Sequence, residues 1–133
     1  MQTETSQMTE PQTSSTRYVL PPMRWRIETA KQLALELWGT SEDELTSKRR
    51  FKHILYARYA LMLLLHDVAG CTDDQISKLF NMLRSNVTHG RKTGASWLNR
   101  DPHFTATYES LQNAYQIEIE KHKDNQNGNI NEN

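Results

Sequence analysis

Residues 50–68 (RFKHILYARYALMLLLHDV) constrain the fold more than any other segment, because they are strongly apolar and rich in good helix formers. A helix that is apolar around most of its circumference has to be covered by other elements. We therefore predict that this segment forms the central buried helix of a small domain and that Gly70 ends it. No apolar run reaches 18 residues, so we expect no membrane span.

Helix signals also occur on both sides of this segment. Apolar residues spaced three and four apart predict an amphipathic helix over residues 27–38, closed by Gly39. Capping boxes, in which a Ser or Thr and a Glu or Gln three residues later bind each other's backbone N–H groups, open short helices at Ser41 and Thr72. Residues 81–83 interrupt the second of these. Neither a strand pattern nor an internal repeat occurs, so the predicted class is all-α, a small helical bundle.

Two more helices are expected after this break. Ser85 is a natural N-cap for the first of them. Its inner stripe is predicted to comprise Val87, Gly90, Gly94 and Trp97. Each glycine inside a helix costs roughly 1 kcal/mol against alanine, so this helix is either pliable or packed closely on the core through its backbone. Asp101 and Pro102 start the last helix. Its inner stripe is predicted to comprise Phe104, Tyr108, Leu111, Tyr115 and Ile119.

The two ends of the chain differ in composition from the middle. Residues 1–23 are rich in Thr, Ser, Gln and Pro, and residues 124–133 consist almost entirely of Asn, Asp, Gln, Gly and Glu. Neither end can bury enough apolar surface to offset the entropy lost on ordering. We predict disordered tails over both ranges and one domain over residues 24–123.

A formal net charge of zero hides an uneven distribution of charge. Residues 24–100 carry 13 Lys and Arg against 8 Asp and Glu, a net charge of +5, whereas residues 101–133 carry −4. Four positive charges fall within five residues, at Lys48, Arg49, Arg50 and Lys52. A solvated surface patch is one interpretation of this cluster, but a basic body favours a polyanionic partner.

The pattern over residues 72–98, a short helix, a tight turn and a second helix with polar outer residues, is typical of a helix-turn-helix. In that motif the second helix enters the major groove of DNA and its first residues contact base edges. Arginine binds guanine and asparagine binds adenine through paired hydrogen bonds, while Ser and Thr bind either base. The candidates for base contacts are Arg84, Ser85, Asn86 and Thr88, with Lys92 for a phosphate contact. An ordinary bundle of short helices with a polar face is the alternative.

Several blocks of sequence, in order and at nearly constant spacing, resemble the C-terminal DNA-binding domain (domain IV) of the bacterial replication initiator DnaA. LTSKRRFKHI followed by ARYALMLLL is similar to the family's basic loop and the helix after it. DDQISKLFN resembles its Ile-Gly-x-x-Phe-Gly helix, VTHGRK the Val-x-His-Ala segment of its recognition helix, and NRDPHFTATYESL its last helix. The resemblance runs from about Ile27 to Leu111 and implies a DnaA domain IV-like, Trp-repressor-like fold that contains the helix-turn-helix.

The resemblance also implies roles for individual residues. The family's basic loop places an arginine in the minor groove, where a narrow groove concentrates negative potential, and makes further contacts to phosphates. By position these roles fall to Lys48, Arg49, Arg50 and Lys52. Arg58, in the Ala-Arg match, is a further candidate for a contact to the DNA backbone. Thr72 caps the first helix of the motif, whose free N–H groups would hold a phosphate.

The sequence departs from the family pattern in two respects. The family's recognition helix usually begins Asp-His-Thr/Ser-Thr, whereas this chain has Arg84-Ser85-Asn86 after a turn that is one residue shorter. We therefore expect a different set of bases to be bound. The family's ATPase domain has no counterpart in these 133 residues, which contain no Gly-x-x-x-x-Gly-Lys-Ser/Thr loop, so we expect no nucleotide cofactor.

Other classes of function have weaker support in the sequence. No two of the five histidines have helical i, i+4 spacing or a second ligand type at a zinc spacing, so we expect no metal site. No nucleophile elbow occurs, so we expect no enzymatic activity and no cofactor. Cys71 is the only cysteine and the N-terminus does not resemble a signal peptide, so we expect a cytoplasmic protein.

Together these features predict a stand-alone, sequence-preferring protein that binds double-stranded DNA in replication or transcription control, with a phage or mobile element as the expected setting. Two alternatives stay open. One is a protein-interaction module that keeps the fold and binds a partner through the acidic last helix (YESLQNAYQIEIEKHK). The other is an antagonist that occupies the DNA sites of the replication initiator.

Overall fold

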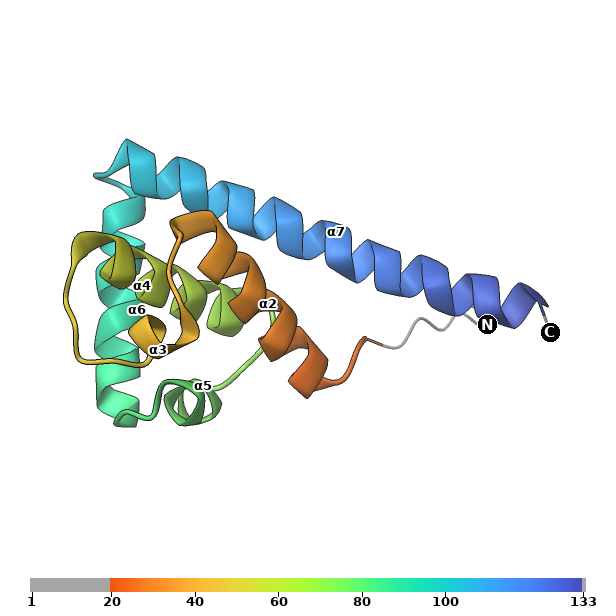
Figure 1. Ribbon diagram of the computed structural model, residues 1–133, viewed down its shortest axis with the longest axis horizontal. Helices are drawn as coiled ribbons and strands as arrows, with labels where there is room; N and C mark the ends of the chain where they lie inside the picture. Colours follow the sequence, from red (N-terminus) through yellow and green to blue (C-terminus); the bar gives the residue numbers. More distant parts are fainter. Residues whose placement is uncertain (1–19, 133) are drawn as a thin grey trace, which may run out of the picture.

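The computed structural model describes residues 20–132, and the side chains of residues 20–125. This part of the chain contains six helices and no strand, which confirms the all-α prediction (Figure 1). The helices are α2 (Met23–Trp38), α3 (Glu42–Leu45), α4 (Lys52–Asp67), α5 (Asp73–Phe80), α6 (Arg84–Leu98) and α7 (Pro102–Glu132).

Helix α4 is the centre of the bundle, as its composition predicts. Every residue from Tyr56 to Leu65 is buried. Helices α2 and α6 pack against it, and α5 and α7 also contact it. Helix α7 lies along α2 and contributes its predicted stripe from Phe104 to Ile119 to the core. The other helices therefore shield the long apolar part of α4 from solvent.

The helices begin and end where local signals place them. Glu44 N–H donates to Ser41 Oγ over 3.1 Å, and Gln75 N–H donates to Thr72 Oγ1 over 3.1 Å, so both capping boxes are formed. Asn81 (φ 54°) ends α5 in the left-handed region. Phe104 N–H donates to Asp101 Oδ1 over 3.1 Å and caps the start of α7. These predictions are confirmed because each depends on residues only a few positions apart.

Two glycines of α6 face α4 at close range. A Cβ added at Gly90 would lie 2.7 Å from Met62 Sδ and 3.0 Å from two ring carbons of Tyr59. A Cβ added at Gly94 would lie 3.0 Å from Leu63 Cδ1. Of the two explanations for these glycines, close packing of the backbone on the core is therefore the one that the structure supports.

Several predicted boundaries need correction. Helix α6 begins at Arg84, with Leu83 as an N-cap residue that makes no side-chain hydrogen bond, so Ser85 lies in the first turn and is not the cap. Helix α7 continues to Glu132 through the predicted C-terminal tail, because extending an existing helix fixes one residue for each new hydrogen bond. At the other end Pro21 is buried and its carbonyl accepts a hydrogen bond from Arg26 Nε, so the ordered part begins before residue 24. The predicted disorder of residues 1–19 lies outside the described residues.

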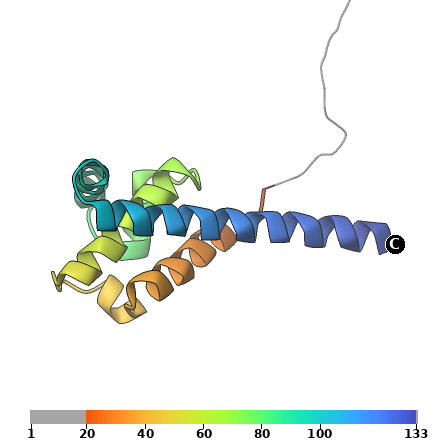
Figure 2. The same cartoon turned by 90° about the horizontal axis from the view of Figure 1, so that it is seen from above.

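Helix α7 is much longer than the bundle that it covers. Its residues as far as His122, whose ring centre lies 4.9 Å from that of Trp25, pack on the other helices, and its C-terminal end projects beyond them (Figures 1 and 2). The connection between α3 and α4 lies at the opposite end of the molecule, together with α6 (Figures 1 and 2). Among the described helices, none combines the length and the apolar composition needed to cross a membrane.

Candidate nucleic-acid interface

Helices α5 and α6 are joined by the short connection 81–83 and held together by an ion pair. Arg91 Nε and Nη2 donate to the two carboxylate oxygens of Asp73, each over 2.7 Å. Thr88 Oγ1 also donates to Asp73, over 2.7 Å. The hydrogen bonds from Arg91 and Thr88 lower the pKa of Asp73 to about 2. The orientation of α5 relative to α6 is therefore fixed by directional contacts in addition to apolar packing.

The outer face of α6 presents most of the predicted base-contact residues to solvent. Arg84, Ser85 and Asn86 are all exposed in its first turn, and Lys92 is exposed two turns later. A shallow depression of about 620 Å³ runs along this face. It is lined by Leu83, Arg84, Ser85, Thr88, His89 and Lys92. The structure thus gathers four predicted site residues, Arg84, Ser85, Thr88 and Lys92, on one surface.

Thr88 is less free than its neighbours. Because its hydroxyl proton is directed at Asp73, the oxygen can accept a hydrogen bond from a ligand but has no proton left to donate. Thr88 can therefore contact only bases that offer a hydrogen-bond donor, such as the amino groups of adenine and cytosine.

Residues 46–51, which we call the basic loop, connect α3 to α4, and Arg58 holds this loop in place. Arg58 is 5% exposed, and its guanidinium donates to the carbonyls of Leu45 (2.9 Å), Glu44 (3.2 Å) and Ser47 (2.8 Å). Burial, with a smaller effect of the nearby positive charge of Arg50, lowers the pKa of Arg58. The structure therefore gives no support to the predicted contact of Arg58 with the DNA backbone, because main-chain carbonyls already accept hydrogen bonds from its guanidinium. The helix around it is apolar on nearly all sides, so its guanidinium is turned inward, where main-chain carbonyls satisfy it.

A second, smaller pocket joins the basic loop to α6. It has a volume of about 260 Å³ and lies between Arg50 of the loop and Asn86 and His89 of α6. Its floor is formed by Arg58 and the apolar side chains of Tyr59, Met62 and Met82. No carboxylate lines this pocket. Two segments that are more than 30 residues apart in the sequence therefore contribute to one positively charged hollow.

The cations of this region are largely available to a ligand. Lys48, Arg50, Arg84 and Lys92 are exposed and form no ion pair with any residue whose side chain is described. Arg49 is also exposed and lies 3.8 Å from Glu44, a distance at which an exposed pair contributes little. Lys31, in contrast, is buried between Glu28 and Glu42. Positive charge that no described carboxylate neutralises is therefore found on the basic loop and on the outer face of α6.

Two predicted site residues are not part of this surface. Lys52 is the first residue of α4, and its ammonium lies 5.4 Å from the centre of the Tyr56 ring, where it lines a different pocket. Thr72 caps α5, but Asp73 and Asp74 follow it in the first turn. Two carboxylates at this helix end already interact with its dipole and would repel a phosphate. The structure therefore gives no support to a phosphate site at Thr72.

Two residues of this surface, Leu83 and His89, are not among the site residues predicted from the sequence. Leu83 is 71% exposed at the start of α6, where an apolar side chain can contact the methyl group of thymine. His89 lines both hollows, the one along α6 and the one beside the basic loop. The position of His89 one turn after Ser85 was a usable signal for its exposure, whereas nothing in the sequence marks Leu83 as exposed.

Comparison with known proteins identifies no family for this chain. No protein-family model matches the chain, and no curated protein matches it significantly. The resemblance to domain IV of DnaA stays a prediction.

Proposed function

We propose that this protein binds double-stranded DNA with a preference for particular sequences, in the control of replication or transcription. In this proposal α5 and α6 form a helix-turn-helix of the kind found in domain IV of DnaA. Helix α6 enters the major groove, where Arg84, Ser85 and Asn86 contact base edges. The basic loop lies over the adjacent phosphates and directs an arginine toward the minor groove.

The observation that supports this proposal most is the shared pocket of Arg50, Asn86 and His89. A cluster of lysines and arginines on a loop alone is compatible with a solvated patch. Here the loop is anchored by Arg58 and borders the first turns of a helix whose outer face is exposed and polar. One duplex can therefore contact the loop and α6 at the same time. A solvated patch of charge would not need the loop to lie beside α6.

The test is a selection of bound duplexes from a random pool, followed by sequencing and by titration of the selected site. We expect an enriched motif and tighter binding to it than to a scrambled duplex of the same composition. The variant Arg50→Gln with Arg84→Gln should abolish the enrichment. Arg24→Gln with Lys121→Gln is the matched control, because it also removes two exposed positive charges, from α2 and α7, and neither residue lines a hollow beside α6. Binding without enrichment and without response to salt would refute the proposal.

The projecting C-terminal end of α7 supports a second candidate role, the binding of a protein partner (Figure 2). Residues 101–133 carry a net charge of −4, so a partner would offer a basic surface. If the selection yields no motif, this role becomes the better explanation. The experiment that tests it is a titration of the full chain with an unrelated cationic peptide and with a matched neutral peptide, to measure whether α7 binds basic partners by charge.

A further inference from the structure

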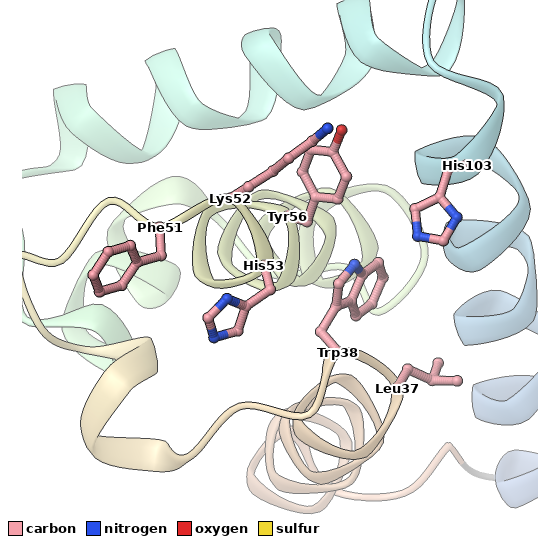
Figure 3. A pocket seen from close by; sticks show the side chains of 7 residues that line it. All are labelled: Leu37, Trp38, Phe51, Lys52, His53, Tyr56 and His103. Atoms are coloured by element: carbon pink, nitrogen blue, oxygen red, sulfur yellow. The ribbon is translucent and has the colours of Figure 1, made fainter.

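A third pocket lies between the C-terminal end of α2 and the N-terminal ends of α4 and α7, and it borders the basic loop only through Phe51 (Figure 3). It is open to solvent and has a volume of about 640 Å³, within the range of pockets that hold small organic molecules. The proposed function does not use it.

Aromatic side chains form most of its wall. Trp38 lies between His53 and His103, and the ring of Tyr56 lies above it in the same view (Figure 3). Phe51 stacks on His53 with their ring centres 6.4 Å apart and leaves 63% of its surface exposed. Exposed aromatic surface around a hollow favours a ligand with a flat apolar body, because burying both surfaces removes them from water.

The polar groups of the pocket are hydrogen-bond donors. Lys52 contributes an ammonium, and His53 and His103 each carry a ring N–H in every protonation state. No Asp or Glu lines the pocket. Asp101 accepts a hydrogen bond from the Tyr56 hydroxyl, and this bond, with a smaller contribution from the charge of Lys52, lowers the pKa of Asp101. The charge and the donors are therefore complementary to an anionic group on the ligand.

Trp38 adds an independent observation. Its side chain is 9% exposed, and its Nε1–H has no hydrogen-bond partner among the described residues. Buried donors are almost always paired in folded proteins, so an unpaired one at the floor of a pocket requires an explanation. Trp38 lines the pocket, so an acceptor atom of a ligand bound there is the partner that we infer for this donor.

From this combination we propose that the pocket binds a small aromatic anion, a molecule with a flat apolar body and one carboxylate or sulfonate. The aromatic body stacks on Trp38 and Phe51. The anionic group accepts hydrogen bonds from Lys52 and from the imidazoles at the rim. The proposal does not depend on DNA binding, because its site shares no lining residue with either hollow beside α6.

The test uses two fluorescent probes of similar shape on the full chain. The first, 8-anilinonaphthalene-1-sulfonate, has an aromatic body and a negative charge, and the second, N-phenyl-1-naphthylamine, has the same body without the charge. We expect saturable, one-to-one binding of the sulfonate. Lys52→Gln should weaken it by about fivefold and leave the neutral amine unchanged, because only the charge-assisted contact is removed. Phe51→Ala should weaken both probes, since it removes a stacking surface.

Lys78→Gln is the matched control for the loss of one exposed ammonium, because Lys78 lies on α5 and does not line the pocket. The ring resonances of His53 and His103, measured by NMR on adding the sulfonate, should shift more than those of His66, which lies at the other end of α4. Circular dichroism of each variant checks that it is folded. The proposal is overturned if the sulfonate does not saturate, if Lys52→Gln weakens both probes equally, or if the shifts occur at His66 instead.

Discussion

Asp73 and Arg91 join α5 to α6 through two parallel hydrogen bonds of 2.7 Å, across 18 positions of sequence. Both side chains are largely shielded from solvent, with exposures of 15% and 19%. A paired arrangement of this kind fixes an angle as well as a distance. The position of α6 on the surface therefore depends on one carboxylate of α5.

Stability should fall in acid through Asp73. Its pKa in the folded protein is about 2, below the ordinary value of 3.8, so its contribution is fully present above about pH 5 and is lost as the pH falls toward 2. The difference amounts to about 2 kcal/mol. In urea unfolding, the advantage of the unaltered protein over Asp73→Asn should shrink by that amount between pH 6 and pH 2. Asp74→Asn, at an exposed pair with Lys78, is the control for removing a carboxylate from the same helical turn.

The loop arginines and Arg58 should give opposite results when they are replaced. Arg49→Glu with Arg50→Glu should weaken binding to every duplex while leaving helix content unchanged, since both side chains are exposed. Arg58→Met should instead lower the free energy of unfolding by about 3 kcal/mol, because three main-chain carbonyls lose their donor. Thermal unfolding and anisotropy titrations of both variants separate the two effects. Unfolding of the double Glu variant would show that these arginines are structural.

The affinity for duplex DNA should fall steeply with salt. The exposed cations of the proposed surface, Lys48, Arg49, Arg50, Arg84 and Lys92, neutralise about four to five phosphates if all of them are engaged. The slope of log affinity against log salt concentration should then be about −4. Titrations at several salt concentrations measure it, and a flat response would refute the electrostatic part of the proposal.

Arg84 and Asn86 should determine which sequence is bound. Paired hydrogen bonds to guanine and adenine discriminate by about 1–3 kcal/mol each, so Arg84→Ala and Asn86→Ala should relax the preference at one base each. Binding to a scrambled duplex should decrease less. If both variants lose specific and non-specific binding equally, these side chains contact the DNA backbone and the assignment of the helix fails.

Gly90→Ala should destabilise the protein, although alanine favours helices. The new methyl group would lie 2.7 Å from Met62 Sδ and 3.0 Å from the Tyr59 ring, so α6 must move away from α4 or the core must repack. Overpacking costs about 1–3 kcal/mol, and contacts as short as these favour the upper part of that range, above the roughly 1 kcal/mol gained in helix propensity. Urea unfolding measures the balance. Ala95→Gly, at an exposed position of the same helix, is the control for propensity alone.

The sequence predicts the local features of this fold well and the contacts between distant residues poorly. Capping boxes and left-handed ends depend on residues three or four apart, so Ser41, Thr72 and Asn81 behave as their neighbours dictate. The inner stripes of α6 and α7 follow from periodicity in the same way. The pair of Asp73 and Arg91, in contrast, exists only once two helices have been placed, and no spacing rule connects them.

Arg58 illustrates why the candidate site was only partly predictable. In an amphipathic helix the polar residues mark the outer face, but residues 56–65 are apolar almost throughout, so the sequence does not show which side a lone arginine faces. Arg84, Ser85 and Asn86 were easier, because they lie opposite the small and apolar residues of α6. The approach of Arg50 to Asn86 depends on the path of the loop, and that path depends on Arg58.

The anchoring by Arg58 separates the path of the basic loop from the identity of its side chains. All three acceptors are main-chain carbonyls, which a residue of any type provides. The side chains of residues 48–50 are exposed and take no part in this anchor. These three positions can therefore be randomised in a library while the domain keeps its stability. Variants with new ligand preferences can be selected from such a library, because the path of the loop stays the same while its side chains change.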